Sequence, residues 1–320
     1  MTHVAPKPKR PKPLAINGWI NLDKPAGVTS TDMVTAVKRA LNAAKAGHAG
    51  TLDPLATGIL PIALGEATKT LYYVTDTVKG YEFTITWGQA RDTDDAEGQV
   101  IATSDTRPTE QAIRAALPAF IGTVMQLPPK FSALKVNGER AYNLARAGTE
   151  FTLEPRPVQI DSLDLIETTA DTARLTCVCG KGTYVRSIAR DLAEILGTKG
   201  YISALRRTRV GCFNETTAIS LAHLRETALQ HPPQAFVLPI GQALDDIPAL
   251  TLTQPEAVRI KSGNAIDLVS RLDVERLTNA GLDPRLTNDT LALAKDGKGQ
   301  DLALLSVTGP RISPVRVFNF

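Results

Sequence analysis

The run GHAGTLDPLATGILPIALGEATK, Gly47–Lys69, places one acidic residue, Asp53, among four glycines and two prolines, with no second acid before Glu66. Glycine allows positive φ values and close approach of another backbone or a ligand, so this loop leaves room near Asp53. Asp-Pro is also an ordinary turn, and aspartate is an ordinary helix cap. A lone carboxylate in such a loop is typical of a nucleophile or a cap, and not of one half of an acid/base pair.

Composition is that of a soluble globular protein. The chain has 320 residues, which exceeds the usual size of one compact core, so a large domain with a smaller one is expected. No stretch approaches the roughly 20 apolar residues of a membrane span, and the start MTHVAPKPKRPKP has no apolar signal region. We therefore expect a cytoplasmic protein.

The chain has three cysteines, and a structural thiol pair is expected at Cys177 and Cys179. Together with Cys212, these cysteines suit a reducing compartment better than a disulfide scaffold or a metal site.

The basic charge is concentrated at the N-terminus. The net charge is +3, but +4 of it comes from Lys7, Lys9, Arg10 and Lys12, which leaves the rest of the chain at −1. A nucleic-acid surface must then be a local patch, and the acid-free stretch Lys199–Arg209, with Arg206 and Arg207, is one candidate. A solvated strand edge is the alternative for these two arginines. Residues 1–13 are expected to be a disordered tail that adds non-specific attraction to phosphate.

Hydrophobic periodicity switches repeatedly between helical and strand patterns. Residues Ser30, Thr31 and Asp32 offer caps for a helix that carries Val34, Val37 and Leu41 on one side. From Lys79 the apolar residues instead alternate, as in a half-buried strand: Tyr81, Phe83, Ile85 and Trp87. Helices are also predicted at 109–120 and 183–196, and strands at 158–166 and 173–179. This mixture favours the α/β class, in its mixed α+β form.

The pattern changes after about residue 250. A helix is predicted at 254–261, followed by short strands near 290–295, 302–307 and 315–320. Residues 267–288 are polar and partly helical in pattern, which indicates an insertion.

Several stretches resemble one known family. The chain is similar to the TruB family, the bacterial tRNA pseudouridine-55 synthases, over about residues 17–250. The resemblance rests on Gly47–Lys69 and on GWINLDKPAGVTS (18–30), KGYEF (79–83), QLPPKFSALKVNGERAYNLARAG (126–148), GKGTYVRSIARDL (180–192) and LRRTRVG (205–211). One departure is Arg91 in GQARDTDDAEG, where the family usually has Thr; it lies far from the catalytic motifs in sequence, so little consequence is expected.

The resemblance implies a fold and a reaction. The expected fold is the pseudouridine synthase catalytic fold, a central, mostly antiparallel sheet flanked by helices, over 14–249 with an RNA-binding insertion at about 124–152. A small PUA-like β-barrel is expected over 250–320, with the insertion at 267–288. The implied reaction isomerises uridine at position 55 in the T-loop of tRNA. It involves no oxidation or group transfer, so no cofactor and no metal are expected.

The implied catalytic residues are Asp53, Arg186 and Tyr81. As the nucleophile, Asp53 could attack the sugar at C1′ or the base at C6, or it could assist elimination to a glycal, and the sequence leaves these routes open. Arg186 lies in the first turn of a predicted helix, where a cation opposes the helix dipole and calls for an anion such as Asp53. Periodicity alone makes Tyr81 a core residue, whereas the resemblance implies that it stacks on the uracil and is a candidate proton acceptor.

The resemblance also implies substrate contacts. A uridine in a folded loop must be flipped out of its stack, and His48 matches the family residue that fills the space left behind. Tyr184 and Leu205 match residues that line the uracil pocket. The remaining expected RNA contacts are Lys24, Lys130, Arg206 and Arg207.

The expected partner is the T-arm of tRNA, bound by a monomer without membrane association or an obligatory protein partner. Two alternatives stay open at this point. The chain could be a component of an RNA-guided pseudouridine synthase, or a tRNA-folding chaperone and binding module in which catalysis is secondary.

Overall fold

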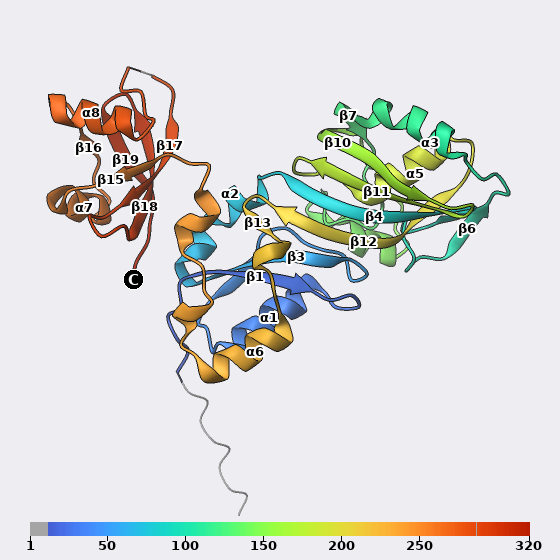
Figure 1. Ribbon diagram of the computed structural model, residues 1–320, viewed down its shortest axis with the longest axis horizontal. Helices are drawn as coiled ribbons and strands as arrows, with labels where there is room; N and C mark the ends of the chain where they lie inside the picture. Colours follow the sequence, from blue (N-terminus) through green and yellow to red (C-terminus); the bar gives the residue numbers. More distant parts are fainter. Residues whose placement is uncertain (1–11, 286) are drawn as a thin grey trace, which may run out of the picture.

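The computed structural model describes residues 12–285 and 287–320. The expected basic tail, residues 1–13, lies almost wholly outside these ranges. Two sheets organise the described chain, a large one at the centre and right of Figure 1 and a smaller one at the left.

The large sheet has the strand order β14-β1-β3-β12-β4-β11-β10-β7, with β2 paired to β3 and β13 paired to β12. Its pairs are antiparallel except for β1 with β14 and β3 with β12. The strands are β1 (Gly18–Lys24), β2 (Ala46–His48), β3 (Thr57–Leu64), β4 (Lys79–Trp87), β7 (Gly122–Gln126), β10 (Arg156–Thr168), β11 (Thr172–Cys179), β12 (Gly200–Val210), β13 (Phe213–Asn214) and β14 (Ile219–Ser220). The expected central, mostly antiparallel sheet is confirmed.

Helices cover this sheet in two groups. At the β1 end, α1 and α6 contact each other (Figure 1), while α5 packs on β4 and β12, and α3 packs on β10. The helices are α1 (Ser30–Ala40), α2 (Leu71–Thr75), α3 (Glu110–Ala116), α5 (Val185–Ile195) and α6 (Leu221–Gln230). Short 3-10 segments follow β3 at Gly65–Thr70 and α3 at Leu117–Phe120.

The predicted elements agree with these bounds, with local differences. Thr29, and not Ser30, is the N-cap of α1, and Asp32 completes its capping box. The expected helix at 109–120 becomes 3-10 at Leu117, where Pro118 follows. In α5 the buried face includes Ile188 and Leu192 as predicted, but Ile195 is exposed.

The segment between β7 and β10 forms a small unit of its own. It contains a two-stranded hairpin, β8 (Lys135–Val136) with β9 (Glu139–Arg140), and the helix α4 (Ala141–Arg146). A second hairpin, β5 (Gln89–Arg91) with β6 (Val100–Thr103), follows β4.

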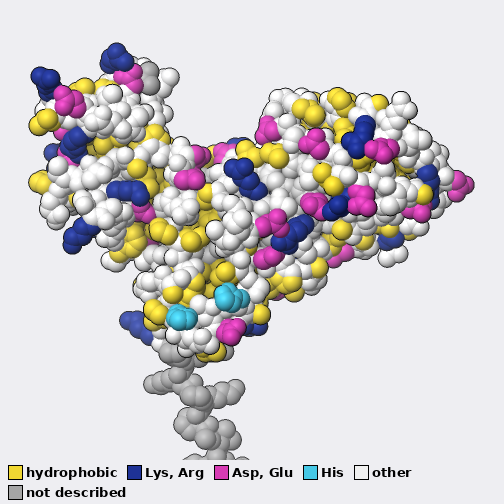
Figure 2. Space-filling view, viewed as in Figure 1, with side chains coloured by type: hydrophobic (Ala, Val, Ile, Leu, Met, Phe, Trp, Pro, Cys, Tyr) yellow, Lys and Arg dark blue, Asp and Glu magenta, His cyan; other side chains and the backbone are white. Residues whose placement is uncertain are grey.

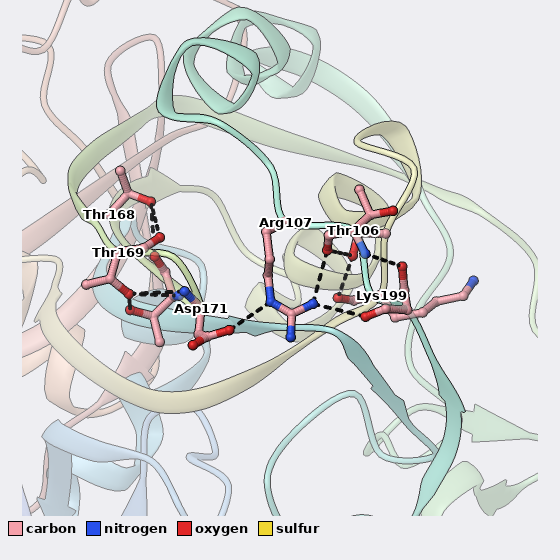
Figure 3. Close-up of polar contacts among 9 residues, drawn as sticks. Thr106, Arg107, Thr168, Thr169, Asp171 and Lys199 are labelled. Atoms are coloured by element: carbon pink, nitrogen blue, oxygen red, sulfur yellow. Dashed lines mark hydrogen bonds and ion pairs between the residues drawn. The ribbon is translucent and has the colours of Figure 1, made fainter.

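Polar contacts fix the end of β4 and β11 that lies away from Asp53. Arg107 Nε donates to Asp171 Oδ1 at 2.8 Å, and its Nη1 donates to the carbonyls of Ser104 at 3.0 Å and Thr106 at 3.2 Å (Figure 3). These bonds join the loop before α3 to the turn between β10 and β11.

The smaller sheet has the order β15-β17-β18-β19-β16 and two helices beside it. Its elements are β15 (Ala249–Thr251), α7 (Gln254–Lys261), β16 (Ile266–Asp267), α8 (Arg271–Asn279), β17 (Thr290–Lys295), β18 (Asp301–Thr308) and β19 (Arg311–Val317). The predicted helix at 254–261 is confirmed, and α8 supplies the helical part of the 267–288 segment. The curled sheet agrees with the expected PUA-like domain.

An apolar cluster joins the two sheets. Trp19 and Phe213 of the large sheet pack in it with Leu293 and Leu304 of the smaller sheet and with Phe318, which follows β19. Within the described ranges, no helix is long and apolar enough to cross a membrane.

Candidate active site

The loop that carries Asp53 connects β2 to β3 and is fixed by the connection between β1 and α1. Ser30 Oγ accepts a hydrogen bond from the Leu52 amide at 2.8 Å and donates to the Leu52 carbonyl at 3.0 Å. The Pro54 carbonyl accepts from the Gly27 amide at 2.8 Å. Asp53 thus lies between Leu52 and Pro54, whose backbones both bond to the segment that joins β1 to α1.

Lys24, the last residue of β1, holds this loop through hydrogen bonds from its ammonium group. Its ammonium donates to the carbonyls of Pro25 at 2.9 Å, Val28 at 2.8 Å and Pro54 at 3.2 Å, which occupies all three of its protons. Burial lowers the pKa of Lys24 to about 8, and the nearby Asp53 carboxylate opposes that shift. Lys24 is fully buried and its bonds hold the loop, and the expected contact between Lys24 and substrate stays a prediction.

Arg207 is a second buried cation against the same loop. Its guanidinium donates to the carbonyls of Ile59 at 2.8 Å, Gly50 at 3.1 Å and Thr51 at 3.4 Å. Gly58 has φ +99°, and a Cβ there would lie 2.2 Å from the Arg207 carbonyl oxygen, so glycine is required for this approach. Arg207 is only 2% exposed, so it is not a solvated strand edge, and its expected contact with RNA stays a prediction.

Arg206 belongs to the opposite face of β12, because successive strand residues alternate. Its guanidinium forms ion pairs with Asp23 Oδ2 at 2.9 Å and with Glu215 Oε1 at 2.5 Å. These carboxylates neutralise the charge that a phosphate contact would use. The two arginines therefore do not form one patch on this strand, and the salt dependence of tRNA binding tests whether Arg206 contacts RNA.

Arg186, the second residue of α5, holds Asp53. Its Nε lies 3.0 Å from Asp53 Oδ2, and the arginine is 4% exposed. Nη1 also donates to the Thr93 carbonyl at 2.9 Å, and Nη2 to the Phe131 carbonyl at 3.0 Å. One side chain thereby connects the Asp53 loop with two loops that are distant in sequence.

A second carboxylate, Asp95, shares Arg186 with Asp53. Asp95 Oδ2 lies 3.6 Å from Arg186 Nη1, while Oδ1 accepts from Thr93 Oγ1 at 2.6 Å and from the Glu97 amide at 3.1 Å. Burial raises the pKa of Asp95. Sequence reasoning missed this residue, although four acids close together in DTDDAEG were a signal.

Although Arg91 lies far from the catalytic motifs in sequence, its loop reaches the site through Asp95. Arg91 itself braces this loop, with Nη1 donating to the carbonyls of Ala96 at 3.2 Å and Gly98 at 2.9 Å. Its guanidinium also lies over the ring of Tyr201, 4.4 Å from the centroid.

A cavity of about 310 Å³ opens beside Asp53, and its walls include Tyr81, Tyr184, Arg186, Leu205 and Arg207. The register of β4 and β12 sets Tyr81 opposite Arg207. Burial raises the pKa of Tyr81, and the Arg207 cation opposes that shift. Tyr184 is fixed by its backbone, which exchanges hydrogen bonds of 2.8 Å and 3.1 Å with the Gln126 side chain.

His48 and Lys130 are not among the described residues that line this cavity. His48 ends β2 opposite Ile62, and its buried Nδ1 has no hydrogen-bond partner among the described residues. Burial lowers the pKa of His48, and the cations of Arg207 and Arg140 lower it further. Lys130 is exposed and lines a groove with Phe131 and residues 148–152. Among the described residues there is no group of three or more His, Cys, Asp or Glu side chains that could hold a metal ion.

Solved structures share this fold. The chain superposes on a structure of a Cbf5-Nop10-Gar1 complex with a TM-score of 0.71, at 24% identity, over 95% of this chain and 85% of that one. A structure of an H/ACA RNP bound to a substrate RNA containing 2′-deoxyuridine gives a TM-score of 0.70 at 22% identity, with the same two shares covered. The chain therefore has the fold of the proteins in these two structures.

Family models and relatives identify the class of enzyme and the family of this chain. A model described as TruB family pseudouridylate synthase (N terminal domain) matches residues 38–185, and one described as tRNA pseudouridylate synthase B C-terminal domain matches residues 186–245. The tRNA pseudouridine synthase B of Caulobacter vibrioides is 52% identical over 97% of this chain and 99% of its own length. That of Roseobacter denitrificans is 54% identical over 97% and 98%. The chain belongs to the TruB family of pseudouridylate synthases.

Proposed function

We propose that this chain converts uridine to pseudouridine at position 55 in the T-loop of tRNA, with Asp53 as the nucleophile. The observation that carries the proposal is the ion pair between buried Arg186 and Asp53, whose side chain is 35% exposed, at the mouth of the Tyr81 cavity. Relatives at about half identity over nearly the whole chain carry the name tRNA pseudouridine synthase B, which supports tRNA as the substrate.

The reaction breaks the bond between N1 and C1′, turns the uracil and joins C5 to C1′, so C5 must lose its proton. Arg186 engages Oδ2 of Asp53, which leaves Oδ1 as the oxygen that can bond to C1′ or C6. Elimination to a glycal, with the carboxylate accepting a proton, uses the same oxygen. The geometry is compatible with all three routes.

The cavity walls would hold the detached base. Tyr81 and Tyr184 supply aromatic surfaces and Leu205 an apolar one, and base stacking on aromatic rings contributes about 1 to 3 kcal/mol per base. Because burial raises the pKa of Tyr81, its phenol stays protonated at neutral pH. That state favours stacking as its main role over proton abstraction.

The rest of the RNA would contact the surrounding surface. A flipped uridine leaves a gap in its loop, and His48, at the edge of the Asp53 loop, is proposed to fill it. The insertion at 124–152, with the exposed Lys130, and the domain over 250–320 are proposed to bind the folded RNA by its shape. The chain would do this as a monomer without a protein partner.

Tritium release tests this function. Purified protein, with EDTA and without nucleotide, should release tritium from an unmodified tRNA transcript that carries 5-tritiated uridine. A transcript with cytidine in place of the T-loop uridine 55 should release none. If the first transcript releases no tritium, or the second releases it normally, the proposed reaction or the proposed position is wrong.

A further inference from the structure

A second ion pair lies one helical turn beyond Arg186 on α5. Arg190 Nη1 is 3.1 Å from Asp94 Oδ2, and its Nη2 donates to the Leu127 carbonyl at 2.7 Å. Its Nε also contacts Asp191 Oδ1 at 2.8 Å. Residues four apart share a helix face, so Arg190 and Arg186 point toward the same side of α5.

The two arginines connect the same pair of segments. Arg186 reaches the Thr93 carbonyl and the Phe131 carbonyl, and Arg190 reaches Asp94 and the Leu127 carbonyl. Residues 127–131 lie within the proposed RNA-binding insertion at 124–152, and residues 93–95 carry the second carboxylate of the site. The base of the insertion and the loop beside Arg186 are therefore fastened together through α5.

Asp94 has a strained backbone at this junction. Its φ is +60°, a left-handed conformation that is uncommon outside glycine and that aspartate and asparagine tolerate best. Its amide donates to the Arg91 carbonyl at 3.0 Å, and its carbonyl accepts from the Ile202 amide at 3.0 Å. Such strain is characteristic of functional sites, where neighbouring contacts maintain it.

We infer that Arg190 and Asp94 are positioning residues for the reaction: they transmit the seating of RNA under the insertion to the loop that orients Arg186 against Asp53. The inference rests on the function proposed above. Neither residue lines the cavity in the described chain, so neither would touch the uracil.

The charge of Asp94 makes it possible to distinguish a positioning role of this residue from a purely structural one. The carboxyl faces Arg190, Arg186 and Asp191 of α5 and is followed in its own loop by Asp95. Burial raises the pKa of Asp94 to about 6, against the pull of the two arginines. An acid with a raised folded pKa binds its proton more tightly when folded, so its ionisation reduces stability as pH rises from about 4 to about 6. Asparagine at 94 removes that cost and keeps the left-handed conformation.

The test compares Asp94→Asn, Arg190→Met and the double variant in single-turnover tritium release at saturating tRNA. Each single variant should lower the rate constant about tenfold, with Kd within about twofold, and the double variant should be no slower than either. The melting temperature of Asp94→Asn at pH 7.5 should equal or exceed that of the wild type. The wild-type rate constant should fall as pH drops through about 6, and the rate constant of Asp94→Asn should not show this decrease.

Arg114→Met on α3 is the control, because Arg114 also bonds a carboxylate, Glu110 at 2.8 Å, and a backbone carbonyl, that of Leu165 on β10 at 3.4 Å, and does not line the cavity. Its rate should be unchanged. A wild-type rate in Asp94→Asn, additive losses in the double variant, or a rate loss matched by a lower melting temperature would overturn the inference. Absence of release by the wild type would instead overturn the proposed function.

Discussion

At the scale of single residues, three cations organise the Asp53 loop. Lys24 and Arg207 bind backbone carbonyls of residues 50–59, and Arg186 binds the carboxylate itself. A loop has carbonyls that no strand neighbour satisfies, and buried ammonium and guanidinium groups satisfy them here. Only Arg186 leaves its anion partly exposed, so the reactive group and its supports are different residues.

The pairing of Arg186 with Asp53 could be anticipated, because a cation at a helix N-terminus calls for an anion. The positions of Lys24 and Arg207 could not. The distant partner of Lys24, Pro54, is 30 residues away in sequence, and the partners of Arg207 are 148 to 157 residues away. A charged side chain also normally predicts exposure. Asp95 was missed for the same reason, since its partner Arg186 lies on a different element.

Lys24→Met should reveal the support that Lys24 gives. The variant loses three part-buried hydrogen bonds to carbonyls, so the free energy of unfolding should fall by about 3 kcal/mol. Lys38→Met, on the exposed face of α1, should change it by no more than about 0.5 kcal/mol. Denaturant unfolding of both variants makes the comparison, and equal stabilities would show that Lys24 does not hold the loop.

At the scale of elements, periodicity predicted the strands and helices that have one buried and one solvated face, such as β4, β11 and α1. The strand β3 could not be assigned in this way. It is apolar throughout and contains Pro61, which argues against an internal strand, yet it pairs with β1 along its whole length. The alternation of β12 has the largest functional consequence, because it puts Arg206 and Arg207 on opposite faces.

This alternation changes where RNA contacts are expected. Lys130→Ala should flatten the dependence of tRNA affinity on salt by about 0.7 to 0.9 log units per decade of salt, as for one lost phosphate contact. Arg206→Ala should leave that slope unchanged, because Asp23 and Glu215 already neutralise the guanidinium. Binding titrations at several salt concentrations measure both slopes. If Arg206→Ala flattens the salt dependence and Lys130→Ala does not change it, the RNA-binding surface includes β12 and not Lys130.

At the scale of the whole molecule, the distribution of charge could be predicted from the sequence, whereas the packing of the two sheets against each other could not. The count of −1 outside the basic tail predicted no general attraction for RNA, and the face in Figure 2 shows basic and acidic side chains interspersed. The junction between the two sheets was not predictable. It depends on Phe318 and on Lys69, whose ammonium donates to the Val317 carbonyl at 2.7 Å across 248 residues.

The central claim is that Asp53 is the nucleophile, and Asp53→Asn tests it most directly. The amide keeps the size of the side chain but lacks the negative charge that attacks C1′ or C6, so single-turnover tritium release from 5-tritiated tRNA should fall by on the order of 10⁴ or more. Affinity for tRNA should stay within about threefold, because the binding surface is kept. A rate constant within about tenfold of the wild type, at equal affinity, would contradict the account.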